Sequence, residues 1–387
     1  MAGEYFVGRE EEFRQFEANL DGLGDGTANH AFVAGLHGAG KTSYLDRLTD
    51  LAQHRGFLGV LTNVNEQAKG VESVKAILSA IAAAIQEWGE QNNLSLNTAT
   101  DWDRGADSTL FRQAKIEKLE ADRVRKDFTS LSKIAADAGA RGIVLCIDEG
   151  QWIPPDALSA LKSALEAQKH VVAIVSLRLP TVNIDLKRDG RAQLDAIARE
   201  AGGDIGASRL YTTEIAMGPF ADEGEALRCI ERRLKDNAIR FEKELSIEII
   251  QLAERIPREI IRYSHKVYAR ALESQREASL ALLDEVVRDE HAGEVAQAAS
   301  LVESQSGSVQ AMLKALLDLN GCATSRQLAQ RFQTTADEKG LAMIADGVSS
   351  QLESVCDQFS GLRKLDEYFE ITSRVHFYAL RIALKER

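Results

Sequence analysis

The stretch of the chain with the clearest chemical meaning is residues 35–42, GLHGAGKT, which fits the pattern G-x-x-x-x-G-K-T. Glycines at this spacing let the backbone curl so that its N–H groups point at phosphate oxygens, and a following helix adds positive potential. In this pattern the lysine reaches the β- and γ-phosphates and the threonine hydroxyl binds Mg²⁺. The expected nucleotide contacts are Gly35, Gly38, Ala39, Gly40, Lys41, Thr42 and Ser43, with Thr42 also a metal ligand.

The surroundings of this pattern support a phosphate-binding loop. Residues 30–34 form a short apolar segment typical of a strand, and residues 43–48 carry apolar side chains at helical spacing. Strand, glycine loop and helix are the context that the pattern requires. The alternative is an ordinary glycine-rich turn, but such a turn needs neither lysine nor threonine at these positions.

A second group of chemically active residues follows the apolar run at 142–147. A continuous apolar run predicts a central strand covered on both faces. Asp148 and Glu149 come directly after it, at the strand end where ligands bind in open α/β sheets. We expect Asp148 to hold Mg²⁺ and Glu149 to activate the attacking water, which favours hydrolysis over binding alone. The alternative is an acidic strand end without a catalytic role.

Composition narrows the class of protein. The chain has 387 residues, 44% hydrophobic and 27% charged, with a formal net charge of −12. This acidity argues against non-specific nucleic-acid binding by the whole surface, although a local basic face remains possible in principle. No apolar run approaches a membrane span, and the first residues lack a signal-peptide pattern. The four cysteines are widely spaced, so we expect neither a zinc site nor disulfides, and a cytoplasmic location fits.

The order of the expected elements predicts an α/β fold class. Apolar strands at 57–62, 142–147, 171–176 and 211–216 alternate with helices, which is typical of a doubly wound parallel core. Helices are expected at 9–23, 71–88, 109–138 and 156–168. From residue 223 to 299 the pattern is entirely helical. We therefore predict a P-loop NTPase core over residues 1–220 and a helical lid over residues 221–300.

The last part of the chain, residues 301–387, is predicted to be a winged-helix-like domain. Residues 303–308 are polar and contain glycine, which indicates a linker. Three helices are expected at 309–319, 325–332 and 341–355, followed by a hairpin at 359–371 and a final helix at 374–384. Three helices with a hairpin are what a winged helix requires.

Together these motifs resemble those of the AAA+ and STAND ATPases, with the origin-recognition-type branch and its bacterial relatives the most similar. Residues 6–10, FVGRE, match a box that contacts adenine in those families. The resemblance implies that Phe6, Val7 and Gly8 line the base pocket and that Arg9 adds a polar contact or pairs with a nearby acid. An N-terminal arm packed on the core is the alternative. ATP and Mg²⁺ are the cofactors that the resemblance implies.

The same resemblance implies roles for four further residues. Ser176 ends the strand at 171–176 and matches sensor 1, while Arg178 is similar to an arginine that many STAND proteins carry there. Arg209 lies just before the last strand, where the family places its arginine finger. Arg258 matches the sensor-2 arginine of the lid, although Arg255 and Ile256 stand where glycine is usual. A polar strand end, a surface arginine and a simple helix start at Pro257 are the alternatives.

Charge bears on whether the C-terminal domain binds DNA. Residues 301–387 contain ten Lys and Arg and eleven Asp and Glu, and the presumed recognition helix at 341–355 has no cation. Only Arg363 and Lys364 in the hairpin are locally basic, which is poor for phosphate contact. A second basic face could come from lid residues spaced four apart: Arg258, Arg262, Lys266 and Arg270.

These observations lead to one preferred function and two alternatives. The preferred function is an ATP-hydrolysing switch or motor subunit that acts on a protein partner and assembles into a homo-oligomer on ATP binding. An accessory role in a bacterial DNA-processing, transposition or defence system would suit it. The first alternative is a DNA-binding initiator or loader. The second is a module that holds ATP without turnover, against which Glu149 argues.

Overall fold

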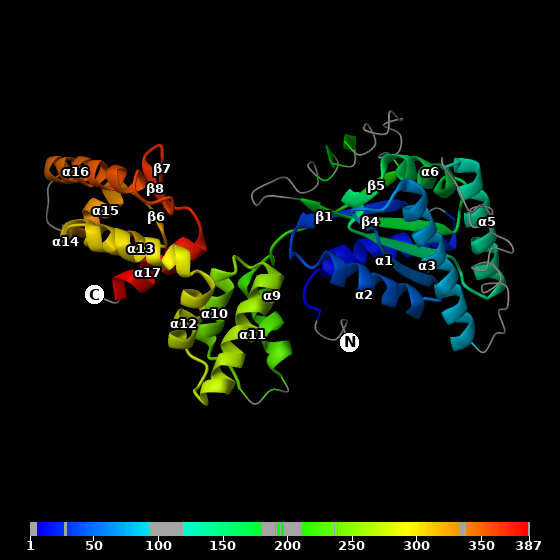
Figure 1. The fold of residues 1–387 in the computed structure, drawn as a ribbon, viewed down its shortest axis with the longest axis horizontal. Helices are drawn as coiled ribbons and strands as arrows, with labels where there is room; N and C mark the ends of the chain where they lie inside the picture. Colours follow the sequence, from blue (N-terminus) through cyan, green and yellow to red (C-terminus); the bar gives the residue numbers. More distant parts are fainter. Residues whose placement is uncertain are drawn as a thin grey trace. The chain divides into compact units, whose positions relative to one another are not determined.

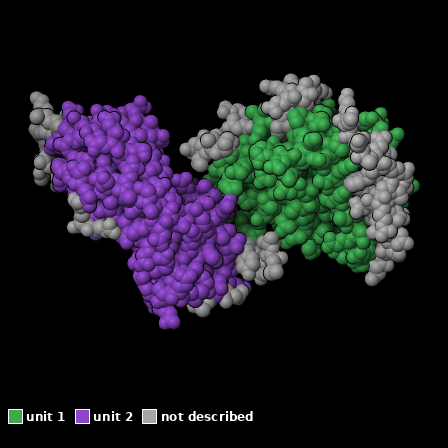
Figure 2. Space-filling model, viewed as in Figure 1, with its two compact units in different colours: residues 1–221 green, residues 222–387 purple. Residues whose placement is uncertain are grey.

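The computed structural model describes residues 6–26, 29–92, 119–179, 190, 192–193, 195–196, 210–235, 237, 239–332 and 338–385. Two compact units divide the chain, Met1–Ala221 and Asp222–Arg387, coloured separately in Figure 2. Each unit is described by itself below. Within the described residues, no helix is long and apolar enough to cross a membrane.

The first unit is built on a five-stranded sheet (Figure 1). Its strands run in the order β2-β3-β4-β1-β5, and each neighbouring pair is parallel. Their bounds are His30–Leu36 (β1), Leu58–Asn63 (β2), Ile143–Asp148 (β3), Val171–Leu179 (β4) and Tyr211–Met217 (β5). The predicted parallel α/β core is confirmed.

Helices cover both faces of this sheet, as a doubly wound core requires. They are α1 (Glu10–Gly24), α2 (Lys41–His54), α3 (Gly70–Gln91), α5 (Ala121–Asp137) and α6 (Pro155–Leu165). The central strand β3 shows the division, because Ile143, Leu145 and Ile147 join a core with α3, α5 and α6, while Val144 and Cys146 join a core with α1 and α2. Such two-sided burial explains why the strands read as continuous apolar runs.

The helix predicted at 109–138 is only partly within the described structure. Residues 109–118 lie outside it, and α5 begins at Ala121, with Glu120 in extended backbone before it. Helix α5 buries Val124, Phe128 and Leu131, so the predicted apolar stripe is confirmed for this part.

The second unit begins with four helices: α9 (Glu223–Leu234), α10 (Lys243–Leu252), α11 (Pro257–Ser274) and α12 (Leu280–Glu290). It continues with α13 (Ala292–Ser304), α14 (Gly307–Asp318), β6 (Cys322–Thr324), α15 (Ser325–Phe332), α16 (Glu338–Cys356), β7 (Leu362–Leu365), β8 (Tyr368–Ile371) and α17 (Arg374–Lys385). The last three strands form an antiparallel sheet in the order β6-β8-β7. The predicted helices and hairpin are therefore present.

The break predicted at 303–308 is narrower than expected. Helix α13 runs through Ser304, and Ser306 caps the next helix by accepting from the N–H of Val309, so only Gln305 and Ser306 separate the two helices. Ala298, Leu301 and Val302 of α13 are buried in the same apolar core as α14 and α17. The polar composition of 303–308 reflects a helix cap, not a flexible linker.

Helix α17 joins the C-terminal elements to the helices that precede them. Tyr378 donates from its hydroxyl to the carbonyl of Glu248 at 2.9 Å. The Arg381 guanidinium donates to Glu248 Oε2 at 2.8 Å and to Asp284 Oδ1 at 3.3 Å. Lys385 donates to Asp284 Oδ2 at 3.0 Å. These contacts tie α17 to α10 and α12.

Candidate nucleotide-binding site

The glycine loop connects β1 to α2 and is shaped by the positions of its glycines. Gly38 and Gly40 have φ of 81° and 92°, in the left-handed region that side chains with a Cβ rarely adopt. Gly35 is needed for a different reason, since a Cβ there would lie 2.3 Å from the carbonyl oxygen of Met217 on β5. Gly35 is also paired with Arg178 on β4, which places the loop between two neighbouring strand ends.

Lys41 opens α2, and its ammonium turns back into the loop. The side chain is only 8% exposed, and Nζ donates to the carbonyl oxygens of Gly35 and Leu36, both at 2.9 Å. Burial lowers the pKa of Lys41, and the nearby carboxylates of Glu149 and Asp148 oppose that shift. The ammonium therefore lies between the loop and the two acids that the sequence singled out.

Thr42 and Asp148 meet directly. Thr42 Oγ1 donates to Asp148 Oδ2 at 2.6 Å. The other carboxylate oxygen, Oδ1, accepts from the Ser176 hydroxyl and from the N–H of Glu149, the latter at 3.0 Å. Asp148 and Ser176 are buried, so the end of β3, the end of β4 and the start of α2 converge on one carboxylate.

The chemistry of Thr42 and Asp148 fits a magnesium ion. A hydroxyl and a carboxylate are hard oxygen donors, which Mg²⁺ prefers, and this ion is usually held by one or two carboxylates together with phosphates and water. Among the described residues, no group of three His, Cys, Asp or Glu side chains could hold a metal ion alone. The donor set therefore fits an ion that a nucleotide would help to bind.

Glu149 lies just beyond this carboxylate in a constrained backbone. Its φ of 54° is left-handed, and its N–H donates to Ser176 Oγ at 3.1 Å as well as to Asp148. Its carboxylate Oε2 accepts from the side-chain amide of Gln151, which lies in the short 3₁₀ turn Gly150–Trp152. Sequence reasoning missed Gln151. The available signal was a carboxamide two residues after the acidic pair, within reach of the same turn.

The N-terminal box packs beside the loop helix. The ring of Phe6 meets those of Phe13 and Tyr44, with centroid separations of 5.4 and 6.5 Å. Val7 is buried, and Gly8 has φ of 74°. The Arg9 guanidinium donates to the carbonyl of Gly218 after β5 and lies 3.7 Å from the Glu12 carboxylate. Arg9 therefore has a neighbouring acid, one of the two roles expected for it, and the base-pocket role of Phe6, Val7 and Gly8 stays a prediction.

The remaining predicted residues differ in what can be said of them. Arg178 is exposed at the end of β4, near enough to Lys41 for its charge to lower the pKa of that lysine. Ala39 is buried under the loop and Ser43 is exposed. Arg209 lies outside the described residues. Arg258 is in the first turn of α11 in the second unit, so its predicted contact with nucleotide stays a prediction.

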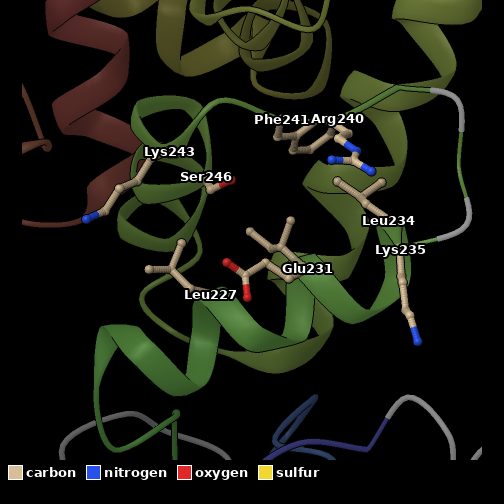
Figure 3. Close-up of a pocket in the computed structure, with 9 residues that line it drawn as sticks. Leu227, Glu231, Leu234, Lys235, Arg240, Phe241, Lys243 and Ser246 are labelled. Carbon is tan, nitrogen blue, oxygen red and sulfur yellow. The ribbon is translucent and has the colours of Figure 1, made fainter.

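A hollow in the second unit contains none of these residues. It has a volume of about 590 Å³ and lies between α9 and α10. Figure 3 shows Lys235 and Lys243 extending outward at its two sides, with Leu227 and Glu231 between them. Acidic and basic side chains are mixed here, so the candidate site rests on the chemistry of the loop and not on this hollow.

Comparison with known proteins agrees with this geometry. Residues 5–175 match the family described as AAA ATPase domain, so the chain carries an AAA-type ATPase domain over this stretch. No curated protein is significantly similar in sequence. The resemblance to AAA-type ATPases is thus confirmed at this level, and the STAND or origin-recognition-type branch stays a prediction.

Solved structures show the same fold. A Walker-type ATPase of Pyrococcus abyssi aligns with a TM-score of 0.51 and 17% identity, over 97% of this chain and 96% of that chain. The RuvB Holliday junction branch migration motor of Thermotoga maritima aligns at 0.45 and 13%, over 96% of this chain and 94% of that one. Domain III of the Thermotoga maritima replication initiation protein DnaA aligns at 0.42 and 13%, over 74% and 95%.

Proposed function

We propose that the protein is a Mg²⁺-dependent ATPase that acts as a switch or motor subunit on a protein partner. The observation that carries the proposal is the convergence of Lys41, Thr42 and Ser176 around the Asp148–Glu149 pair. Hydroxyl, ammonium and paired carboxylates at the end of a central strand are the groups that phosphoryl transfer to water requires. This set would be wasteful in a protein that only held ATP.

Each of these residues has a distinct part in the proposed reaction. The loop N–H groups and Lys41 bind the phosphates, and for this Lys41 exchanges its bonds to the Gly35 and Leu36 carbonyls for phosphate oxygens. Thr42 and Asp148 would hold Mg²⁺, which when bound neutralises charge that develops on the phosphates. Ser176 fixes the orientation of Asp148. Glu149 takes the proton of the attacking water.

A protein partner is favoured over DNA because the basic residues that could bind phosphate are already paired. In the hairpin, Arg363 forms an ion pair with Glu370 at 2.8 Å and Lys364 pairs with Glu353 on α16. In the lid, both Arg262 and Lys266 pair with Glu290 of α12. Each contact with a DNA phosphate would have to displace a carboxylate, which removes most of the electrostatic gain.

Coupling between the lid and the C-terminal elements gives the switch a means of output. The order helix, strand, helix, helix, strand, strand over α14 to β8 fits the proposed winged-helix-like domain. Arg381 and Tyr378 fix this domain to α10 and α12. A lid that responded to nucleotide through Arg258 would therefore carry the C-terminal domain with it.

Assembly and location complete the proposal. We infer that ATP binding favours a homo-oligomer in which Arg209 serves as an arginine finger for a neighbouring subunit, in the cytoplasm. The STAND or origin-recognition-type branch, and a role beside a DNA-processing, transposition or defence machine, belong to the same inference. The second candidate function, a DNA-binding initiator or loader, depends on Arg363 and Lys364 exchanging their carboxylate partners for phosphates.

One experiment separates these functions. The rate of ATP hydrolysis per subunit is measured over a range of protein concentrations, with Mg²⁺, in the presence and absence of duplex DNA. The proposal predicts a rate that rises with protein concentration, because the finger comes from a neighbour, and that DNA leaves unchanged. Stimulation by DNA at physiological salt supports the initiator or loader. Absence of hydrolysis at every concentration contradicts the ATPase.

A further inference from the structure

We propose that Gln151 is a positioning residue that orients the Glu149 carboxylate toward the attacking water. This inference rests on the proposed ATPase function. The side-chain amide of Gln151 donates from Nε2 to Glu149 Oε2, and its Oε1 accepts from the N–H of Arg178 at 3.0 Å. A single carboxamide thus links the acid that follows β3 to the backbone at the end of β4.

The backbone of Glu149 is already fixed, which leaves its side chain as the variable part. Its N–H is held by Asp148 Oδ1 and Ser176 Oγ, and its φ of 54° places it in the left-handed region. The side chain still has freely rotating bonds, and among the described residues Gln151 is the one that donates a hydrogen bond to its carboxylate. Gln151 therefore decides where that carboxylate points.

Gln151 is itself held on both sides. The neighbouring Gly150 lies against β4, where a Cβ would come within 2.1 Å of Val175 Cγ1 and 2.7 Å of the Ser176 carbonyl oxygen. The peptide that supplies Gln151 with its donor, at Arg178, also accepts at its own carbonyl from Gln193 Nε2 at 3.3 Å. The turn and the strand end thus fix the amide before it reaches Glu149.

The chemistry of the two contacts explains why an amide is needed. One end of the side chain must accept from a backbone N–H, and the other end must donate to a carboxylate. A carboxamide provides both at fixed separation, and a neutral imidazole also has one donor and one acceptor. A carboxylate can accept but cannot donate, and it would repel Glu149. A hydrocarbon can do neither.

Three substitutions test the proposal by steady-state ATP hydrolysis. We expect Gln151→Leu to lower kcat between about tenfold and a hundredfold, because a misdirected base costs rate, with KM for ATP within about twofold. Gln151→Glu is expected to lose at least as much, and Gln151→His to recover part of the loss. The matched control is Gln53→Glu, which makes the same charge change on an exposed face of α2.

A double-mutant cycle decides whether Gln151 acts through Glu149. Adding Gln151→Leu to Glu149→Gln should cause no further loss, since the group to be oriented is gone. Independent, multiplying losses overturn the proposal, as does a rise in kcat or a change confined to KM. If Gln151→Leu does not fold by circular dichroism, the His and Glu variants carry the test.

The outcome also separates this proposal from the proposed function. Equal turnover by the wild-type protein and Glu149→Gln contradicts the role of Glu149 itself. A loss in Glu149→Gln together with normal turnover in all three Gln151 variants overturns the positioning role alone.

Discussion

Thr42 Oγ1 donates a hydrogen bond of 2.6 Å to Asp148 Oδ2, although 106 residues separate them in the chain. Two motifs recognised independently in the sequence are therefore parts of one site. The contact exists because α2 starts at the end of β1 while β3 ends nearby in the same parallel sheet, so both side chains lie at one edge.

The close packing of Gly35 against β5 predicts a selective cost for a methyl group. Gly35→Ala would place a Cβ 2.3 Å from the Met217 carbonyl oxygen, so we expect the free energy of unfolding to fall by about 1–3 kcal/mol. Gly293→Ala on α13 is the matched control, since a Cβ there meets nothing within 4 Å, and it should be neutral or slightly stabilising. Urea denaturation compares the two, and equal effects would contradict the packing argument.

Burial of His30 predicts a pH dependence of stability. Ala173 N donates to His30 Nδ1 at 2.9 Å, which requires a neutral ring, and burial lowers the pKa of His30 from 6.5 to about 4. Between these two values the unfolded chain binds a proton that the folded protein does not, so stability falls as pH drops from 6.5 to about 4, by about 3 kcal/mol in total.

A substitution isolates this contribution. His30→Asn keeps an acceptor for the Ala173 N–H but cannot be protonated, so its unfolding free energy should depend less on pH over the same window. Urea denaturation at pH 7, 5.5 and 4 makes the comparison. Parallel curves for the two proteins would show that His30 does not contribute.

The Arg381–Glu248 pair should matter more than the hairpin pair of similar geometry. Both pairs have an N–O separation of 2.8 Å, but the Arg381 side chain is 19% exposed and that of Arg363 is 52% exposed. We expect Arg381→Met to lower the free energy of unfolding by about 1–3 kcal/mol, because it leaves Glu248 without its charged partner. Arg363→Met should cost about 0–1 kcal/mol. A larger loss at Arg363 would contradict this account of how α17 is attached.

DNA binding should be weak at physiological salt, because the hairpin cations are paired with Glu370 and Glu353. The double charge reversal Arg363→Glu with Lys364→Glu should change the affinity little. Fluorescence anisotropy with a labelled duplex at several salt concentrations measures both affinity and its salt slope. Tight binding that weakens steeply with salt and is lost in the reversed variant would move the protein to the initiator or loader class.

The sequence predicted what depends on local pattern. The five core strands, the helix that starts at Lys41 and the hairpin at β7–β8 all follow from apolar runs, periodicity and turn residues close together in the chain. Asp148 and Glu149 were recognisable as site residues because a buried strand leads straight into them. In these parts, local preference and tertiary packing agree.

What the sequence did not predict depends on partners far away in the chain. The strand order β2-β3-β4-β1-β5 is set by packing across the whole sheet. Arg262 and Lys266 form a basic row when α11 is considered alone, and their partner Glu290 comes from α12. Gln151 looked like an ordinary turn residue until the structure placed its amide between Glu149 and Arg178.

The central claim, ATP hydrolysis at Glu149, is tested most directly by separating binding from turnover. Stabilisation by Mg-ATP in a thermal shift titration and ATP turnover are measured for the wild-type protein, Glu149→Gln and Lys41→Ala. Glu149→Gln should keep the ATP-dependent stabilisation and lose most of its turnover, because an amide cannot accept the water's proton. Lys41→Ala should lose both, because the charge at the phosphates is gone. Turnover at the wild-type rate in Glu149→Gln, or undiminished ATP-dependent stabilisation in Lys41→Ala, would contradict the account.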